Sequence, residues 1–248
     1  MTLTHDIAGT GPTVVLLHAG VCDRRMWDPQ WQPLIDAGHR VVRCDFRGFG
    51  ETPAATGPYR DDDDVHDLLD TLGLDRVTLV ACSYGALIAL LVAARWPDRV
   101  TDLVLLSPNR LGHEPGPELR AFGAREDELL EAGDIAGATE LNVDMWLGPD
   151  ADDTARQHVR EQQRHAFEVQ LAADEYPSPD APADLARIRA RSYLVSGAKD
   201  VSDFRQIAAE LADLLPDATH VELPWAGHLP TMERPAEATD LILAALRR

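Results

Sequence analysis

The chain has 248 residues, 45% of them hydrophobic, which is enough for one sizeable core with room for a small inserted domain. Its formal net charge is −19, from 42 acidic and 23 basic residues, and such a field repels nucleic acids and anionic membrane surfaces. We therefore expect no nucleic-acid or membrane partner, and ascribe the acidity to a composition that favours solubility, with halophily or a cationic partner as alternatives.

The first segment, Met1 to Pro12, is polar and lacks the basic and apolar regions of a secretory signal. No apolar run further along the chain approaches the roughly 20 residues that span a bilayer. The three cysteines cannot all be paired, and none forms a CxxC metal-binding spacing. We therefore expect a cytoplasmic protein with reduced thiols and no metal site.

Six short apolar runs rich in β-branched residues predict strands that are buried on both faces. Four segments with helical periodicity alternate with them. This order predicts an α/β fold, in which helices flank both sides of a mostly parallel sheet. The predicted strands are residues 13–17, 41–42, 77–81, 103–106, 192–196 and 218–223, and the predicted helices are residues 62–72, 84–95, 203–215 and 235–246.

Residues 109–182 break the alternation, because they contain no convincing strand. Gly and Pro divide them into predicted helices at residues 118–132, 135–146 and 152–176. A stiff return to the sheet then follows at Pro177, Pro179 and Pro182. We expect this segment to form a helical cap over the C-terminal edge of a core made of residues 1–108 and 183–248.

The sequence around Ser83 combines an apolar strand, a sharp turn and an apolar helix. Ala81 and Gly85 are small residues on either side of the serine, as in a nucleophile elbow. Such a corner projects the hydroxyl above the sheet, and the N–H of Tyr84 at the helix start can point at a developing oxyanion. Because Ala81 replaces the usual glycine, an ordinary strand-to-helix turn is the alternative interpretation of Ser83 alone.

Two loops place an acid and a histidine at the same edge of the sheet. Asp200 follows one predicted strand and His228 follows the last one, and ligands bind at the C-terminal edge of open α/β sheets. We predict that Ser83 is the nucleophile, His228 the general base and Asp200 the acid that orients the imidazole. Asp203 is the alternative acid, unless it caps the helix that follows it.

Several motifs taken in order make the whole chain resemble the α/β-hydrolase superfamily, in its serine-nucleophile branch. The resemblance implies the α/β-hydrolase fold with a helical cap, and it is closest in character to 3-oxoadipate enol-lactonases and small bacterial esterases. The motifs are the oxyanion-loop sequence His18-Ala-Gly20, the Asp45-Phe-Arg-Gly-Phe-Gly50 turn, the elbow at Ser83, residues 97–105 after the elbow helix, and Gly227-His228 followed by Glu233-Arg-Pro235.

The resemblance also assigns roles near the nucleophile. It implies an oxyanion hole made by the backbone N–H groups of Gly20 and Tyr84, with Val21 as the alternative donor. It implies that His18 shapes the oxyanion loop rather than taking part in catalysis. Ala19 departs from the family pattern, which has glycine there.

The substrate pocket and the cysteines near the site are predicted more loosely. Cys82 should point back into the fold, whereas Cys22 is either a reactive thiol or a packed one. Each large apolar side chain is as well suited to the core as to the pocket. We expect the pocket to be lined by Val21, Trp27, Trp146, Phe167 and Trp225.

The predicted function is hydrolysis of a small-molecule ester or lactone through an acyl-enzyme, without a cofactor. Carbon–carbon bond hydrolysis or a cofactor-free peroxidase-like reaction on the same triad is the first alternative. A small-molecule binding protein that retains a hydrolase fold is the second. Haloalkane dehalogenase and epoxide hydrolase chemistry is disfavoured, because both need a carboxylate where this chain has Ser83. The sequence predicts neither the substrate nor the oligomeric state.

Overall fold

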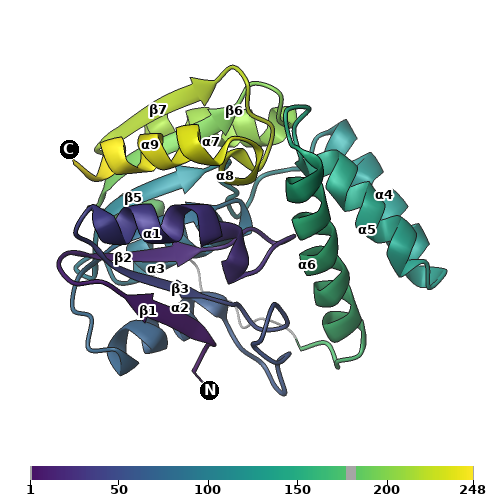
Figure 1. Ribbon diagram of the computed structural model, residues 1–248, viewed down its shortest axis with the longest axis horizontal. Helices are drawn as coiled ribbons and strands as arrows, with labels where there is room; N and C mark the ends of the chain where they lie inside the picture. Colours follow the sequence, from purple (N-terminus) through teal and green to yellow (C-terminus); the bar gives the residue numbers. More distant parts are fainter. Residues whose placement is uncertain (1, 177–182, 248) are drawn as a thin grey trace.

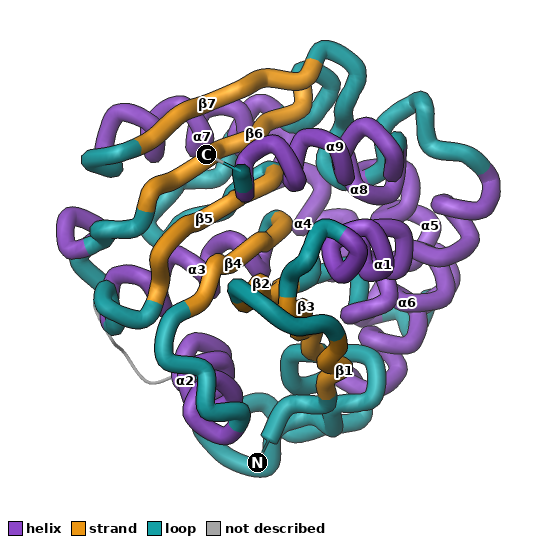
Figure 2. The backbone as a smooth tube through the Cα atoms, turned by 60° about the vertical axis from the view of Figure 1, so that its left-hand side comes forward, coloured by secondary structure: helices purple, strands orange, loops and turns teal. Residues whose placement is uncertain are grey.

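The computed structural model describes residues 2–176 and 183–247 and contains a central sheet with helices on both faces (Figures 1 and 2). The strand order is β1-β3-β2-β4-β5-β6-β7, and every neighbouring pair is parallel except β1 with β3. The predicted, mostly parallel sheet is therefore confirmed. The strands are β1 (His5–Ala8), β2 (Thr13–Leu17), β3 (Arg40–Cys44), β4 (Val77–Cys82), β5 (Val100–Leu106), β6 (Arg191–Gly197) and β7 (Ala218–Leu223).

The central strands are buried on both faces because their side chains alternate between two apolar clusters. In β4, for example, Leu79 and Ala81 belong to one cluster, whereas Val80 and Cys82 belong to the other. Figure 2 shows α2, α3 and α7 on one side of the sheet and α1, α8 and α9 on the other. These helices are α1 (Asp28–Asp36), α2 (Asp61–Thr71), α3 (Tyr84–Arg95), α7 (Ser202–Leu214), α8 (Pro230–Glu233) and α9 (Pro235–Leu246), with 3-10 turns at Arg24–Trp27 and Leu185–Arg187.

The chain between β5 and β6 leaves the sheet and forms α4 (Pro117–Glu131), α5 (Ile135–Trp146) and α6 (Asp153–Leu171). Figure 1 shows these helices beside the carboxyl ends of the strands. The helix predicted to reach Tyr176 ends earlier, at Leu171, and the proline after Tyr176 disfavours helical backbone there. The predicted return through Pro177, Pro179 and Pro182 lies outside the described residues.

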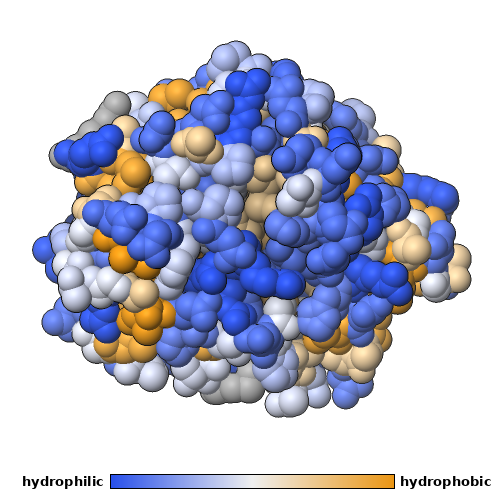
Figure 3. Space-filling model, in the orientation of Figure 1, coloured by the Kyte–Doolittle hydropathy of each residue, from blue (hydrophilic) through white to orange (hydrophobic). Residues whose placement is uncertain are grey.

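The outer surface agrees with the composition of the chain. Hydrophilic residues dominate the face shown in Figure 3, in line with the excess of acidic side chains. Within the described ranges, no helix is both long enough and apolar enough to cross a membrane.

Candidate active site

Ser83 occupies a strained corner between β4 and α3. Its backbone has φ 52° and ψ −113°, a region that costs a non-glycine residue about 1–3 kcal/mol. The corner is held on both sides, because the Ser83 N–H donates to the Leu106 carbonyl at 2.9 Å and the Ser83 carbonyl accepts from Ala86 and Leu87. The hydroxyl is thereby presented at the carboxyl edge of the sheet.

Close packing behind the serine explains which small residues the corner requires. A Cβ at Gly85 would lie 2.5 Å from the carbonyl oxygens of Leu17 and His18, so only glycine lets α3 approach β2 this closely. Ala81, in contrast, is a fully buried residue of β4 within the apolar core. The departure from glycine at that position is therefore accommodated without opening the corner.

The three side chains predicted as a triad form one hydrogen-bonded chain. His228 Nε2 lies 2.7 Å from Ser83 Oγ, and His228 Nδ1 lies 2.9 Å from Asp200 Oδ2. The imidazole is 3% exposed and packs against the rings of Phe204 and Trp146, at centroid distances of 4.2 and 4.7 Å. Water is therefore largely excluded from the His228 ring.

The Asp200 carboxylate is oriented by its own turn after β6. Its Oδ1 accepts from the Val201 N–H at 2.7 Å, which leaves Oδ2 for the histidine. A Cβ at Gly197 would lie 2.2 Å from the Gly227 carbonyl oxygen, so this glycine lets the acid-bearing and histidine-bearing loops meet. Sheet geometry and one small residue thus bring together groups that are 28 positions apart.

Asp203, the alternative acid, makes different contacts. Its Oδ1 accepts from His113 Nε2 at 2.8 Å and from the Gly116 N–H at 2.6 Å, both in the segment leading to α4. Burial would raise the Asp203 pKa, but these hydrogen bonds outweigh it and hold the pKa below its ordinary value. Asp203 does not hydrogen-bond His228, and the N-cap of α7 is Val201, so the capping alternative is wrong. It ties the inserted helices to the core.

Glu233 fixes the loop that carries His228. Its carboxylate accepts from the N–H groups of Gly227 at 2.7 Å and Leu229 at 3.0 Å, the two neighbours of the histidine. Burial raises the Glu233 pKa despite these bonds. The signature Gly-His followed by Glu-Arg-Pro therefore has a physical basis, since the acid holds the backbone on both sides of the imidazole.

Unpaired backbone donors line the cavity that contains the serine. Among the described residues, none accepts a hydrogen bond from the N–H of Gly20, Val21 or Tyr84, and all three residues line the cavity that contains Ser83. His18 is fully buried beneath this loop, where its Nδ1 bonds the Ala19 carbonyl at 2.8 Å. Its Nε2 accepts from the Phe46 N–H at 3.0 Å. Burial lowers the His18 pKa, in keeping with a neutral ring that supports the loop.

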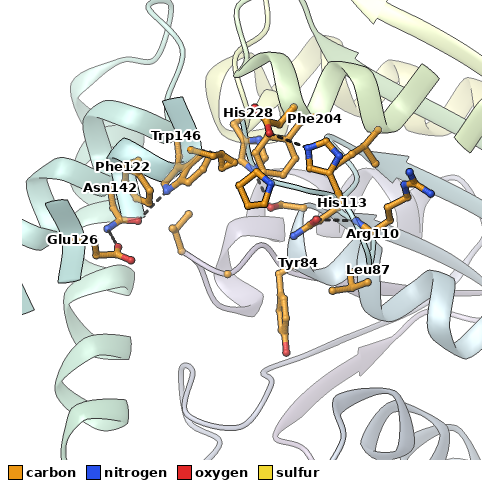
Figure 4. Close-up of a pocket in the computed structure, with 18 of the residues that line it drawn as sticks. Tyr84, Leu87, Arg110, His113, Phe122, Glu126, Asn142, Trp146, Phe204 and His228 are labelled. Carbon is orange, nitrogen blue, oxygen red and sulfur yellow. Dashed lines mark hydrogen bonds and ion pairs between the residues drawn. The ribbon is translucent and has the colours of Figure 1, made fainter. Parts of the chain in front are cut away.

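The cavity beside Ser83 has a volume of about 610 Å³. Figure 4 shows it bounded by Phe122, Trp146 and Phe204 among other residues. Of the predicted pocket residues, Val21, Trp146 and Phe167 line it. Trp27 and Trp225 do not: Trp27 is fully buried in the core, and Trp225 stacks under Arg234.

The comparisons with known proteins agree with this architecture. A family model described as the alpha/beta hydrolase family matches residues 14–241. The chain belongs to the alpha/beta hydrolase family. It is 31% identical over 267 residues to a protein of Variovorax paradoxus (strain S110) that is provisionally named carbamate hydrolase RutD, covering 100% of this chain and 97% of that protein.

Two solved structures resemble this α/β hydrolase closely. The enol-lactonase of Burkholderia xenovorans LB400 superposes with a TM-score of 0.82 at 25% identity, covering 99% of this chain and 96% of that chain. A thermophilic esterase of Thermogutta terrifontis gives a TM-score of 0.80 at 25% identity, covering 99% and 93%. The predicted fold and the predicted resemblance to enol-lactonases and esterases are therefore confirmed.

Several polar residues of the cavity were not predicted. Glu126, Asn142, Gln163 and Gln170 line it from α4, α5 and α6. Helical spacing contains a signal for them, because Gln163, Phe167 and Gln170 share one face of α6 and Phe122 and Glu126 share one face of α4. The spacing does not say which face of each helix meets the sheet.

The Tyr84 side chain anchors the residue after Ser83. Its hydroxyl donates to Asp61 Oδ2 at 2.5 Å, and Asp61 begins α2. Burial raises the Asp61 pKa to about 6, even though the hydrogen bond from Tyr84 opposes that shift. Asp61 belongs to a run of four acidic residues, 61–64, in the first turn of α2, and this member of the run contacts the residue after Ser83.

Replacing Asp61 by asparagine should remove a pH-dependent loss of stability. The folded carboxyl keeps its proton to about pH 6, whereas the unfolded one loses it near pH 4, so wild-type stability falls as the pH rises between these values. Relative to wild type, the free energy of unfolding of Asp61→Asn should therefore rise by ~2 kcal/mol between pH 4 and pH 7. Urea unfolding at both pH values measures this difference, and an unchanged difference would contradict the burial argument.

The three cysteines of this α/β hydrolase are packed rather than reactive. Cys22, Cys44 and Cys82 are free and buried, and burial raises each thiol pKa above its ordinary value. Because the thiolate is the reactive form, we expect no labelling by a chromogenic disulfide reagent in the native protein and full labelling in guanidinium. Rapid labelling of native Cys22 would show that the oxyanion loop opens.

No group of His, Cys, Asp and Glu within the described ranges is arranged to hold a metal ion.

Proposed function

We propose that the protein hydrolyses carboxylic esters or lactones through an acyl-enzyme on Ser83. The observation that carries the proposal is the hydrogen-bonded chain from Ser83 Oγ through His228 to Asp200. The unpaired N–H groups of Gly20 and Tyr84 beside the serine support it. The kinship with a carbamate hydrolase, an enol-lactonase and an esterase agrees, since all three names describe attack at a carboxyl-type carbon.

In the proposed first half-reaction, His228 Nε2 takes the Ser83 proton as Oγ attacks the carbonyl carbon. The oxyanion then accepts hydrogen bonds from the N–H of Tyr84 and that of Gly20, with Val21 as the alternative donor. Collapse of the tetrahedral intermediate breaks the bond to the leaving oxygen, which receives the proton from His228. Asp200 keeps Nδ1 protonated and stabilises the imidazolium formed in between.

The second half-reaction repeats these steps with water. His228 removes a proton from the water, the hydroxide attacks the acyl carbon, and Ser83 Oγ leaves with the proton that His228 returns. In a lactone the leaving hydroxyl stays attached to the acyl chain, so the product is a single hydroxy acid.

We also propose that residues 109–182, as far as they are described, act as a cap that sets specificity. The inserted helices supply one wall of the cavity, with Phe122, Asn142, Trp146 and Phe167 among its residues. The catalytic groups come from loops of the core. Substrate choice and chemistry would then reside in different parts of the chain.

A substrate screen with covalent labelling tests the proposal. Esters, thioesters, lactones and carbamates are each offered, and Ser83 is titrated with a fluorophosphonate whose adduct is located by peptide mass spectrometry. Stoichiometric labelling of Ser83 with turnover of an ester or lactone is expected. Ketone release from a vinylogous diketone without ester turnover would favour carbon–carbon hydrolysis instead. Tight ligand binding without labelling would favour a binding protein.

A further inference from the structure

The described acidic and basic side chains that line the catalytic cavity each bond a partner of the opposite kind, with one exception. Asp203 bonds His113, and Arg110 forms an ion pair with Glu210. His228 bonds Ser83 and Asp200. Glu126 lines the same cavity, and no described cation lies within ion-pair distance of its carboxylate. Among the described residues, Glu126 is therefore the carboxylate of the cavity lining that has no basic partner.

One carboxylate oxygen of Glu126 accepts a hydrogen bond from a described residue, and the other does not. Oε1 accepts from Asn142 Nδ2, and Asn142 Oδ1 in turn accepts from Trp146 Nε1 at 2.9 Å. None of the described residues donates to Oε2. Burial raises the Glu126 pKa above its ordinary value, as expected for a half-buried acid without a cation. Asn142 thus orients the carboxylate, and a bound donor could still reach Oε2.

Gln163 adds an amide group without a described hydrogen-bond partner to the same cavity lining. The residue is 5% exposed and lines the cavity from α6, yet its buried Oε1 has no hydrogen-bond partner among the described residues. An unpaired buried amide oxygen costs about 1–3 kcal/mol, and native proteins keep few of them. This oxygen is shielded from the cavity, so a bound donor reaches it only when the amide turns about the last side-chain bond of Gln163.

The arrangement gives the cavity an acidic end on the inserted helices. Figure 4 shows Glu126 beyond Asn142 and Trp146 as seen from His228, with Arg110 on the opposite side. The Trp146 ring connects this end to the catalytic histidine, 4.7 Å from the His228 ring. The charge of Arg110 is already offset by Glu210, whereas the charge of Glu126 is not offset.

We propose that Glu126 and Gln163 select substrates that carry an ammonium group on the part lying against α4 and α6. The inference rests on the proposed hydrolysis at Ser83 and specifies its substrate class. An ammonium group has a positive charge for the carboxylate and three N–H donors for the two oxygens. A methyl group satisfies neither oxygen, and a carboxylate is repelled by Glu126. Among the described residues of the core, none supplies an equivalent unpaired acid to the lining.

Two ester series with matched chain lengths test the proposal at pH 7.5. The acyl series is p-nitrophenyl 6-aminohexanoate, heptanoate and hydrogen pimelate. The alcohol series is 6-aminohexyl, heptyl and 6-carboxyhexyl acetate. In one series kcat/KM for the ammonium ester should exceed that of the neutral ester by about 10- to 100-fold, with the carboxylate ester slowest. Lack of an ammonium preference in both series, or preference for the carboxylate, overturns the proposal.

Three variants test which residue causes the preference for ammonium esters. Glu126→Gln should bring the ratio of ammonium to neutral kcat/KM close to one, and Gln163→Leu should lower it several-fold. Glu131→Gln removes the same charge from an exposed residue at the end of α4 and should retain the wild-type ratio. A ratio that survives Glu126→Gln, or falls equally in Glu131→Gln, assigns the effect to the overall negative field and overturns the role of Glu126.

Binding to a catalytically inactive enzyme separates failure of this inference from failure of the proposed function. Methyl 6-aminohexanoate and methyl heptanoate are titrated calorimetrically into Ser83→Ala, with and without Glu126→Gln. Tighter binding of the ammonium ester that is lost with Glu126→Gln supports the inference, even if wild type turns over no ester. Equal binding of the two esters overturns it, even if wild-type turnover is normal.

Discussion

Ser83→Ala is expected to lower kcat for a p-nitrophenyl ester by about 10⁵- to 10⁶-fold. The serine oxygen forms the covalent bond in the proposed mechanism, and no described cysteine can replace it. Cys82, the adjacent thiol, is fully buried, and its sulfur lies 3.9 Å from the His228 carbonyl. The turnover that is left would come from the oxyanion donors and from binding alone.

The chain contains a matched control for this substitution. Ser107 is the other described non-glycine residue with positive φ, at 45°, and its buried hydroxyl has no hydrogen-bond partner among the described residues. Ser107→Ala therefore removes an oxygen from a similarly strained serine outside the hydrogen-bonded chain. It should keep kcat within about threefold of wild type, because the oxygen that it removes makes no hydrogen bond to the catalytic groups among the described residues. Equal losses in the two variants would mean that the Ser83 effect is structural.

The sheet could be predicted because its strands are short, apolar and buried on both faces. The elements that were not predicted lack these properties. β1 (residues 5–8) is an edge strand with partly exposed side chains, so it lacks an apolar run. α1 contains Pro33 in its interior, which disfavours a helix unless packing against α9 compensates. Such elements depend on tertiary contacts that a local pattern does not contain.

The positions of Ser83, Asp200 and His228 could be predicted for a related reason. Each follows a strand of a parallel sheet, and parallel strands deliver their carboxyl ends to one edge. Pocket residues lack such a rule. Trp146 and Trp225 are equally apolar in sequence, yet only Trp146 faces the cavity, since that depends on how the inserted helices dock. Gln163 and Glu126 resemble ordinary solvent-facing residues until α4 and α6 meet the core.

Asp200→Asn should lower kcat for the same ester by about 10⁴-fold, whereas Asp203→Asn should leave kcat within severalfold of wild type. Asp200 Oδ2 accepts from His228 Nδ1, and an amide there no longer stabilises the imidazolium and favours the wrong tautomer. Asp203 lies three residues further on, and its carboxylate bonds His113 and Gly116 instead. The two substitutions change the same atoms at neighbouring positions, so they separate a triad acid from a structural one.

The structural role of Asp203 also predicts an effect on stability. Asp203→Asn weakens two hydrogen bonds to the segment before α4, one of them from a histidine, and should cost about 1–3 kcal/mol of unfolding free energy in urea. Its effect on catalysis should fall mainly on KM, because α4 carries Phe122 and Glu126 of the cavity wall. A 10⁴-fold loss of kcat in Asp203→Asn, with Asp200→Asn nearly unaffected, would transfer the role of the acid to Asp203. Because the carboxylate of Asp200, not that of Asp203, lies 2.9 Å from the imidazole, we expect the opposite result.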